Sequence, residues 1–402
     1  MARLIVLSNG HGEDLMASLL ARRLRERAAG RGDSTFVVAG FPIVGEGLAY
    51  LRRGIPIEGV QRAMPSGGFI LKRAANLAAD LRAGLIGLTL AQIRALKALR
   101  SRYDAAVALG DVFCLWLASS VLRRPSVFVP TAKSEYISGH FGFEYRLMRR
   151  AVKVFPRDEA TAQAIRRRGI DAEFVGNLMM DALDIEGIDF FAGASGPGAK
   201  AGGRAPVVAL LPGSREDAYE NAADLASIAA SLPAHFKFLL SLAPGLDPNR
   251  LKQRLADGPG AWSFLPPAAC AKGVSGVLAR AQHRIVVVQG CFGDVLASAD
   301  IVVGLAGTAN EQAVGLGKPV VAFPGRGTQF TKRFAGAQKR LLGESLSLVD
   351  PQPAVVAREV EAILADPERY ARMSAEGRRR MGPPGGLDRL AEQIERLIGH
   401  PA

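Results

Sequence analysis

The residues of this chain best suited to chemistry lie in 301–324, IVVGLAGTANEQAVGLGKPVVAFP. Gly307 and Thr308 form a small turn after an apolar run, and Glu311 follows one helical turn later. A helix that begins on such a turn offers unpaired N–H groups and the positive end of its dipole, which suit a phosphate. A glutamate just inside the helix can accept hydrogen bonds from two vicinal hydroxyls, as a ribose offers. The segment therefore predicts a nucleotide site, with Gln312 beside Glu311.

Two further turns follow apolar runs in the second half of the chain. In LPGSR, residues 211–215, Gly213 and Ser214 would supply backbone donors and Arg215 a guanidinium for a diphosphate. The alternative is a surface turn with a solvated arginine. In QGCFG, residues 289–293, two glycines and an aromatic could hold a planar base, which makes binding candidates of Gly290, Cys291 and Phe292. Cys291 is more consistent with a small loop residue than with a nucleophile, because no partnered histidine is evident.

The first half places acids and a histidine at the ends of two apolar runs. The loop SNGHGED, residues 8–14, contains His11 and Glu13, and Asp111 directly follows the run 105–109. Ligands bind at the carboxyl ends of strands in open α/β sheets, so these side chains are candidates for catalysis. Asp111 could take a proton from an acceptor hydroxyl. The alternative is that the acids only cap the helices that follow.

Metal and disulfide chemistry are not predicted. The three cysteines, Cys114, Cys270 and Cys291, are scattered without a CxxC pair, and the five histidines form no HExxH motif. We therefore expect no metal and no cofactor. An apolar run begins almost at Met1 without the apolar core of a signal peptide, so we expect a cytoplasmic protein. No segment reaches the ~18 apolar residues that a membrane-spanning helix needs, so we expect no membrane span.

Short apolar runs alternate with helical patterns along all 402 residues, and this length favours two domains. Such runs are typical of parallel strands buried on both faces, hence of two Rossmann-like α/β halves. The stretch 187–206, rich in Gly and Ala, separates the halves. We expect domains at 1–180 and 207–382, a linker at 181–206, and a C-terminal helix in 383–402. The runs are 4–7, 36–39, 105–109, 126–129, 152–155, 207–211, 236–240, 285–288, 301–305 and 320–323.

The net charge of +13 lies almost entirely in the first half. Residues 1–180 hold 27 Lys and Arg against 15 Asp and Glu, and residues 181–402 hold 24 against 23. In residues 62–102 basic and apolar side chains alternate at helical spacing with one acid, Asp80, which suits a helix on an anionic membrane surface. The alternative is a packed helix pair with a solvated basic face. Nucleic acid is a poor fit, because the stretch has one aromatic residue, Phe69, for stacking.

With these motifs in order, the chain resembles the lipid-A-disaccharide synthase-related branch of the lipid-A-disaccharide synthase family. The resemblance rests on residues 174–181, FVGNLMMD, on LPGSR at 211–215, and on Gly307, Thr308 and Glu311. It covers about residues 1–380. It implies an α/β fold of the GT-B type, with two Rossmann-like domains facing a cleft and a C-terminal helix that crosses back to the first domain.

The resemblance implies a metal-independent glycosyltransferase that moves a sugar, of the N-acetylhexosamine or a related hexose type, from a UDP-sugar to a lipid or glycolipid acceptor. Gly213, Ser214, Arg215, Gly307 and Thr308 would face the diphosphate, Glu311 the ribose, and residues 290–293 the uracil. Asp111 matches a catalytic candidate of the family. Residues 62–102 would dock on the inner face of the cytoplasmic membrane. Two alternatives stay open. A UDP-GlcNAc 2-epimerase would share the architecture and the nucleotide site without using a lipid. Departures from the family pattern near His11 and Asp111 permit a nucleotide-sugar or lipid-binding protein without activity.

Overall fold

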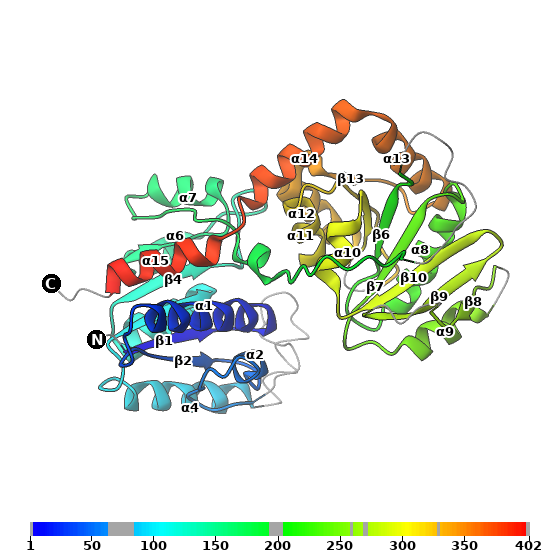
Figure 1. Cartoon of the computed structure of the whole chain (residues 1–402). Helices are drawn as coiled ribbons and strands as arrows, with labels where there is room; N and C mark the ends of the chain where they lie inside the picture. The colour runs from blue at the N-terminus through cyan, green and yellow to red at the C-terminus, as the bar shows by residue number, and fades with distance from the viewer. Residues whose placement is uncertain are drawn as a thin grey trace. The chain divides into compact units, whose positions relative to one another are not determined.

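The chain forms two compact units in the computed structural model, which describes residues 3–62, 84–192, 204–257, 260–267, 272–327 and 330–398. The first unit comprises Met1–Ala182 and Pro384–Ala402, and the second comprises Leu183–Pro383. The chain therefore passes between the units twice. Figure 1 shows the consequence: helices from the two ends of the sequence, α1 and α15, lie in the same unit.

The first unit is built on a parallel sheet with the strand order β2-β1-β3-β4-β5. Its two central strands, β1 and β3, are almost wholly buried, because helices cover both faces of the sheet. This burial explains the continuous apolar runs in the sequence. The strands are β1 Arg3–Ser8, β2 Val37–Pro42, β3 Ala105–Gly110, β4 Ser126–Pro130 and β5 Lys153–Val154.

The helices of the first unit divide between two hydrophobic cores, one on each face of the sheet. Helices α1 (His11–Gly30) and α15 (Gly386–Ile398) pack on one core. The opposite core takes side chains from the remaining long helices and from a π-helical segment, Leu117–Leu122. These helices are α4 Leu85–Ala98, α5 Val112–Trp116, α6 Gly142–Met148 and α7 Glu159–Arg166; the short α2 is Leu48–Leu51.

The return of the C-terminal helix to the first unit is fixed by one carboxylate. Asp181 accepts hydrogen bonds from the backbone N–H groups of Gly385, at 2.6 Å, and of Leu387, at 2.8 Å. A carboxylate at a helix start pairs the orphan N–H groups and complements the dipole. Along the same helix, Glu395 forms ion pairs with Arg27 and Arg31. The predicted crossing of this helix back to the first domain is confirmed.

The second unit contains an eight-stranded sheet with the order β13-β12-β11-β6-β7-β10-β9-β8. The strands from β13 to β10 pair in parallel, and β9 and β8 continue the sheet as an antiparallel edge. The strands are β6 Val207–Leu211, β7 Lys237–Leu242, β8 Ser263–Leu265, β9 Val274–Arg280, β10 His283–Gln289, β11 Ile301–Gly304, β12 Val320–Ala322 and β13 Leu346–Leu348. The helices are α8 Ala218–Ser231, α9 Pro248–Ala256, α10 Phe292–Ser298, α11 Thr308–Gly315, α12 Lys332–Leu342, α13 Pro353–Ala365 and α14 Pro367–Met381.

All ten apolar runs of the sequence overlap strands, but β8, β9 and β13 were not predicted. Strand β9 alternates between buried and partly exposed residues, and β13 has three residues, so neither forms a continuous apolar run. Of the basic and apolar stretch 62–102, residues 63–83 lie outside the described residues. Its second half forms α4, which buries Leu88, Gln92 and Leu96.

Candidate functional site

The predicted catalytic residues lie at the carboxyl ends of two neighbouring strands, β1 and β3. Glu13, in the first turn of α1, is buried, and its carboxylate accepts a hydrogen bond from Thr131 Oγ1 at 3.3 Å. A Cβ atom added to Gly110, the last residue of β3, would lie 3.6 Å from Glu13 Cγ. Asp111 follows Gly110, so the fold brings the two predicted acids to one edge of the sheet. His11 is the first residue of α1.

Asp111 is held by two donors. Its Oδ1 accepts a hydrogen bond from the backbone N–H of Phe113 at 2.9 Å, which caps α5, and its Oδ2 accepts one from Asn9 Nδ2 at 3.2 Å. Burial raises the pKa of Asp111, and the hydrogen bonds oppose this rise. The capping role that the sequence left as an alternative is therefore present, and it fixes the carboxylate at the strand end.

The third ionisable residue of the loop 8–14, Asp14, is a buried carboxyl in the first turn of α1. Asp14 Oδ1 accepts a hydrogen bond from Ser8 Oγ at 2.6 Å, and Ser8 Oγ is also 2.6 Å from the hydroxyl of Tyr50. Burial raises the pKa of Asp14 to about 7; the hydrogen bond from Ser8 opposes the rise, and the charge of Glu13 adds to it. Asp14 thus lies at this edge beside Glu13 with a pKa near neutrality.

A third group of polar side chains follows β4. Lys133 Nζ lies 2.7 Å from Glu144 Oε2, and the same oxygen accepts a hydrogen bond from the backbone N–H of Phe141 at 2.7 Å. Glu144 is buried, and its charge adds to the rise in the pKa of Asp111. Lys133 also lies 3.8 Å above the ring of Phe141. This cluster therefore fixes the start of α6 beside the predicted base.

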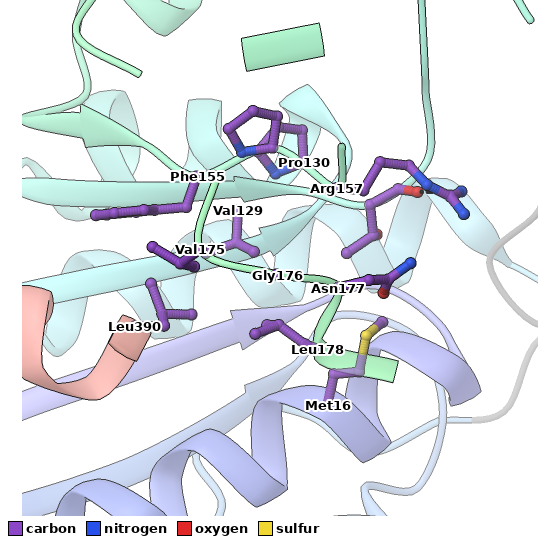
Figure 2. A pocket seen from close by; sticks show the side chains of 12 residues that line it. Met16, Val129, Pro130, Phe155, Arg157, Val175, Gly176, Asn177, Leu178 and Leu390 are labelled. Carbon is purple, nitrogen blue, oxygen red and sulfur yellow. Dashed lines mark hydrogen bonds between the residues drawn. The ribbon is translucent and has the colours of Figure 1, made fainter. Parts of the chain in front are cut away.

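Figure 2 shows a small hollow in the first unit, with about 280 Å³ of empty space. Apolar side chains such as Phe155 and Leu390 gather at one end, and Arg157 and Asn177 lie at the other (Figure 2). Arg157 donates a hydrogen bond to the carbonyl oxygen of Thr131 at 3.1 Å. This space includes open solvent, and its enclosed part has room for about one water molecule, so the hollow is not a pocket for a nucleotide sugar.

In the second unit, the predicted phosphate turn is held by a network of buried amides. Gln338 Nε2, from α12, donates to the carbonyl oxygens of Ala306 at 3.1 Å and Gly307 at 2.8 Å. Asn310 Nδ2 donates to the carbonyl oxygen of Gly304 at 3.1 Å and to Gln338 Oε1 at 2.9 Å. The backbone that precedes α11 is thereby fixed from two helices.

Helix α11 begins at Thr308, which is exposed, and its N-cap residue is Gly307, which has no side chain to cap the first N–H groups. Those N–H groups are the donors that the sequence assigns to phosphate. Glu311 lies partly exposed in the first turn of the helix, and Gln312 is buried beside it.

The LPGSR turn lies directly beside this helix start, because β6 and β11 are neighbours in the sheet. The backbone N–H of Leu305 donates to the carbonyl oxygen of Leu211 at 2.8 Å, and a Cβ atom on Gly213 would be 3.5 Å from the carbonyl oxygen of Leu305. Gly213 has φ 106°, a conformation that favours glycine. Ser214 and Arg215 follow it on the surface. The two backbone turns therefore lie side by side, and Arg215 follows one of them on the surface.

The turn is further tied to α8. Asn221 Nδ2 donates to the carbonyl oxygen of Pro212 at 2.9 Å. Its Oδ1 would be 2.9 Å from a Cβ atom on Gly325, so the loop after β12 also approaches this amide. Asn221, Asn310 and Gln338 were not predicted. They are buried amides on the faces of amphipathic helices, and no local sequence pattern distinguishes them.

The third predicted loop, 289–293, is anchored on both sides. Gln289 Nε2 donates to the carbonyl oxygens of Ala243 at 3.0 Å and Leu246 at 2.8 Å, which joins this loop to the one after β7. Gly290 is exposed with φ 84°, and Phe292 is partly exposed. The thiol of Cys291 is buried, and burial raises its pKa, which fits the small-residue interpretation.

The end of this loop packs against the chain that enters the second unit. Asp294 Oδ1 accepts hydrogen bonds from the backbone N–H groups of Glu186, Gly187 and Ile188 at 2.9, 2.7 and 3.0 Å. Gly293 has no room for a side chain, because a Cβ atom would lie 2.0 Å from the carbonyl oxygen of Asp184. The predicted base-binding loop and residues 184–188 are therefore packed and hydrogen-bonded together.

Metal ligands do not cluster in the part of the chain that the structure describes: no group of three His, Cys, Asp or Glu side chains is placed to hold an ion there. The second unit therefore has a candidate site of backbone donors with Arg215 and Glu311, and the first unit has a candidate site of its own made of carboxyl groups. No helix in the described part of the chain is long and apolar enough to cross a bilayer.

No protein-family model and no curated protein matches the chain. Solved structures match it over nearly its whole length. The UDP-GlcNAc 2-epimerase of Neisseria meningitidis bound to UDP-GlcNAc is 13% identical with a TM-score of 0.53, and the match covers 98% of this chain and 99% of that one. CalG4, the calicheamicin glycosyltransferase, is 18% identical with a TM-score of 0.59, and the match covers 100% and 99%. MurG of Acinetobacter baumannii is 12% identical with a TM-score of 0.53, and the match covers 98% and 99%.

This chain has the GT-B fold. The predicted fold class is confirmed. At these identities the likeness establishes the fold and no activity. The resemblance to the lipid-A-disaccharide synthase-related branch continues to rest on the motifs of the sequence.

Proposed function

We propose that this protein is an enzyme that binds a nucleotide sugar in its second unit. One observation carries the proposal: the LPGSR turn and the Gly307 helix start lie side by side, with the carbonyl of Leu305 beside Gly213. Their backbone N–H groups and the guanidinium of Arg215 match the needs of a diphosphate. Glu311, one turn into α11, would accept hydrogen bonds from the ribose hydroxyls. The loop 290–293 would contact the base.

The nucleotide is proposed to be UDP. The motifs resemble those of a family that uses UDP-sugars, and two of the similar structures are a UDP co-structure and a UDP-GlcNAc complex by their own descriptions. No metal or cofactor is required in this proposal, because Arg215 and the helix start supply the positive potential for the leaving UDP.

The reaction is proposed to be sugar transfer to a lipid or glycolipid acceptor, which makes the protein a glycosyltransferase. The Asp111 carboxylate would take the proton from the acceptor hydroxyl as that hydroxyl attacks the anomeric carbon. The bond from the anomeric carbon to the diphosphate oxygen would break through an oxocarbenium-like transition state, and UDP would leave with the bonding electron pair. Glu13 and His11 would line the acceptor side. A lipid acceptor places the protein at the inner face of the cytoplasmic membrane.

A UDP-GlcNAc 2-epimerase is the second candidate. Several similar structures carry that description, and an epimerase also needs acids and bases near a UDP-sugar. The basic and apolar stretch 62–102 has no role in such an enzyme, and this favours transfer to a lipid.

One experiment separates these activities. The full-length protein is incubated with radiolabelled UDP-GlcNAc, with and without a bacterial membrane lipid extract, and with the Asp111→Asn variant as a control. Transfer predicts label in the organic phase that depends on both the extract and Asp111. An epimerase predicts a C2-epimerised UDP-sugar without any extract. If the protein binds UDP but forms neither labelled lipid nor an epimerised UDP-sugar, it is a binding protein, and the proposal of an enzyme is contradicted.

A further inference from the structure

Asn9 joins the end of β1 to the proposed base, Asp111. Strands β1 and β3 are parallel neighbours in which Ser8 pairs with Leu109, so the residues that follow each strand lie beside one another. A Cβ atom added to Gly110 would lie 3.7 Å from Asn9 Cβ. From this position Asn9 Nδ2 donates a hydrogen bond to Asp111 Oδ2 at 3.2 Å. The register of the two strands therefore places the amide on the carboxylate.

Both oxygens of the Asp111 carboxylate accept hydrogen bonds from N–H donors. Oδ1 accepts from the backbone N–H of Phe113 at 2.9 Å, and Oδ2 accepts from Asn9. Donors favour the ionised form of a carboxyl, and these bonds oppose the rise in the pKa of Asp111 that burial causes. The donor from Phe113 belongs to the backbone. Asn9 is thus the side-chain donor that a substitution can remove.

The surroundings of Asp111 otherwise favour the protonated acid. Burial raises the pKa of Asp111 most, and the charge of Glu144 raises it further. The charge of Asp111 in turn adds to the rise in the pKa of Cys114. The ionisable residues on the elements around Asp111 include His11, Glu13 and Asp14 on α1, Cys114 on α5, Lys133 after β4, and Glu144 on α6. Lys133 is paired with Glu144, so the donors to Asp111 must offset its burial if it is to accept a proton near neutral pH.

The backbone on both sides of Asn9 is fixed by a buried network. Ser8 Oγ donates to Asp14 Oδ1 at 2.6 Å and lies 2.6 Å from the hydroxyl of Tyr50. The carbonyl oxygen of Gly10 accepts a hydrogen bond from the backbone N–H of Asp14 at 2.8 Å. This network has no part in the proposed reaction. Because it holds the residues before and after Asn9, it lowers the entropy cost of keeping the amide against the carboxylate.

The second polar atom of the amide shows what orients the side chain. Asn9 Oδ1 is buried and has no hydrogen-bond partner among the described residues. A buried acceptor without a partner costs free energy. If the amide turned over, this oxygen would face the carboxylate of Asp111, and two acceptors would repel one another. The hydrogen bond from Nδ2 to Asp111 is therefore the interaction that sets the direction of the amide.

We propose that Asn9 is a positioning residue that holds the Asp111 carboxylate in place as a hydrogen-bond and proton acceptor. The inference rests on the proposed function, in which Asp111 is the base. Asn9 acts through the carboxylate and not on the reacting atoms. The pH range in which Asp111 can accept a proton then depends on Asn9, and the buried network of Ser8, Asp14 and Tyr50 supports this role from behind.

The test is a carbon-13 NMR titration of the aspartate carboxyl groups in the full-length protein. The signal that is missing from Asp111→Asn identifies Asp111. Asn9→Leu removes the donor and should raise the proton affinity of Asp111 about tenfold or more, because a hydrogen bond to the charged form is lost. The matched control is Asn177→Leu, which changes a buried amide of the same unit that accepts from the N–H of Met179. Its effect on Asp111 should stay within twofold.

Each outcome decides the proposal. A rise in the proton affinity of Asp111 in Asn9→Leu alone supports it. No rise, or an equal rise in Asn177→Leu, overturns it. If Asn9→Leu does not fold, Asn9→Ala is titrated instead and judged by the same two results.

The titration contains neither UDP nor an acceptor, so it is independent of the proposed function. A protein that binds UDP without turnover would contradict the proposed function and leave the titration result intact. Where turnover is measured, the acidic limb of the pH profile of kcat/KM should move to higher pH in Asn9→Leu, because the base would lose its proton only at higher pH. An unmoved limb would overturn the role of Asn9.

Discussion

Gln338 donates a hydrogen bond from its side-chain amide to the carbonyl oxygen of Gly307 at 2.8 Å, across 31 residues of sequence. The contact fixes the turn whose N–H groups begin α11. Because a phosphate site made of backbone donors depends on the direction of those donors, we propose that the side chain of Gln338 is a positioning group for the nucleotide.

Replacement of Gln338 by leucine should therefore weaken UDP binding, although the proposed site gives this side chain no contact with UDP. Two partly buried carbonyl oxygens would lose a donor, which costs about 1–3 kcal/mol for an unsatisfied group. Part of that cost should appear as roughly tenfold weaker binding of UDP. Calorimetric titration with UDP measures the change. Arg340→Ala, an exposed residue of the same helix, is the control, and an equal effect of both substitutions would contradict this role.

Arg215 is proposed to contact the diphosphate from the surface. Arg215→Ala should weaken UDP binding by about 1.5–3 kcal/mol, the range for a hydrogen bond to a charged group, and should leave uridine binding unchanged. Lys252→Ala removes an exposed positive charge elsewhere in the second unit and controls for general electrostatics. Loss of uridine and UDP binding to the same extent would show that Arg215 does not act on the phosphates.

Asp111→Asn tests the proposed base. The amide oxygen of asparagine can still accept from the N–H of Phe113, so the cap of α5 is kept while the proton acceptor is lost. The turnover rate should fall by roughly 10²–10⁴, with UDP affinity and melting temperature unchanged. Full turnover in this variant would exclude Asp111 as the base.

The sequence predicts more of the fold than of the candidate site. Buried strands such as β1 and β3 have continuous apolar sequences, so the strands could be located. The Gly307 and LPGSR turns directly follow such strands, so the turns could be located as well. The antiparallel strand β9 was missed because its residues alternate between buried and partly exposed positions. The pairing of Ser8, Asp14 and Tyr50 was also missed, since residues 42 positions apart meet only after β1 and α2 have packed together. A buried amide such as Gln338 gives no local pattern at all.

Asp14 predicts a pH dependence of stability. Burial raises its pKa from 3.8 to about 7 in the folded state, so between these values the folded state holds a proton that the unfolded state has lost. The free energy of unfolding should therefore fall as pH rises from about 4 to 7, by up to about 4 kcal/mol at 1.4 kcal/mol per unit. Asp14→Asn keeps the shape and should remove this fall.

Urea unfolding of both proteins at pH 4.5 and pH 8 measures the difference. At pH 8 the Asp14→Asn variant should have a larger free energy of unfolding than the unsubstituted protein. At pH 4.5 this difference should be much smaller. The same difference at both pH values would show that Asp14 is not protonated in the folded protein near neutrality.

The central claim, a UDP site at the Gly307 helix start, is tested most directly by calorimetric titration of the full-length protein with UDP, without added metal. The same titration is made with Glu311→Ala and with Glu344→Ala, an exposed glutamate elsewhere in the second unit, as its control. The account predicts that the unsubstituted protein and the control bind UDP and that Glu311→Ala loses most of the affinity. An unsubstituted protein that does not bind UDP, or a Glu311→Ala variant that binds it equally well, would contradict the account.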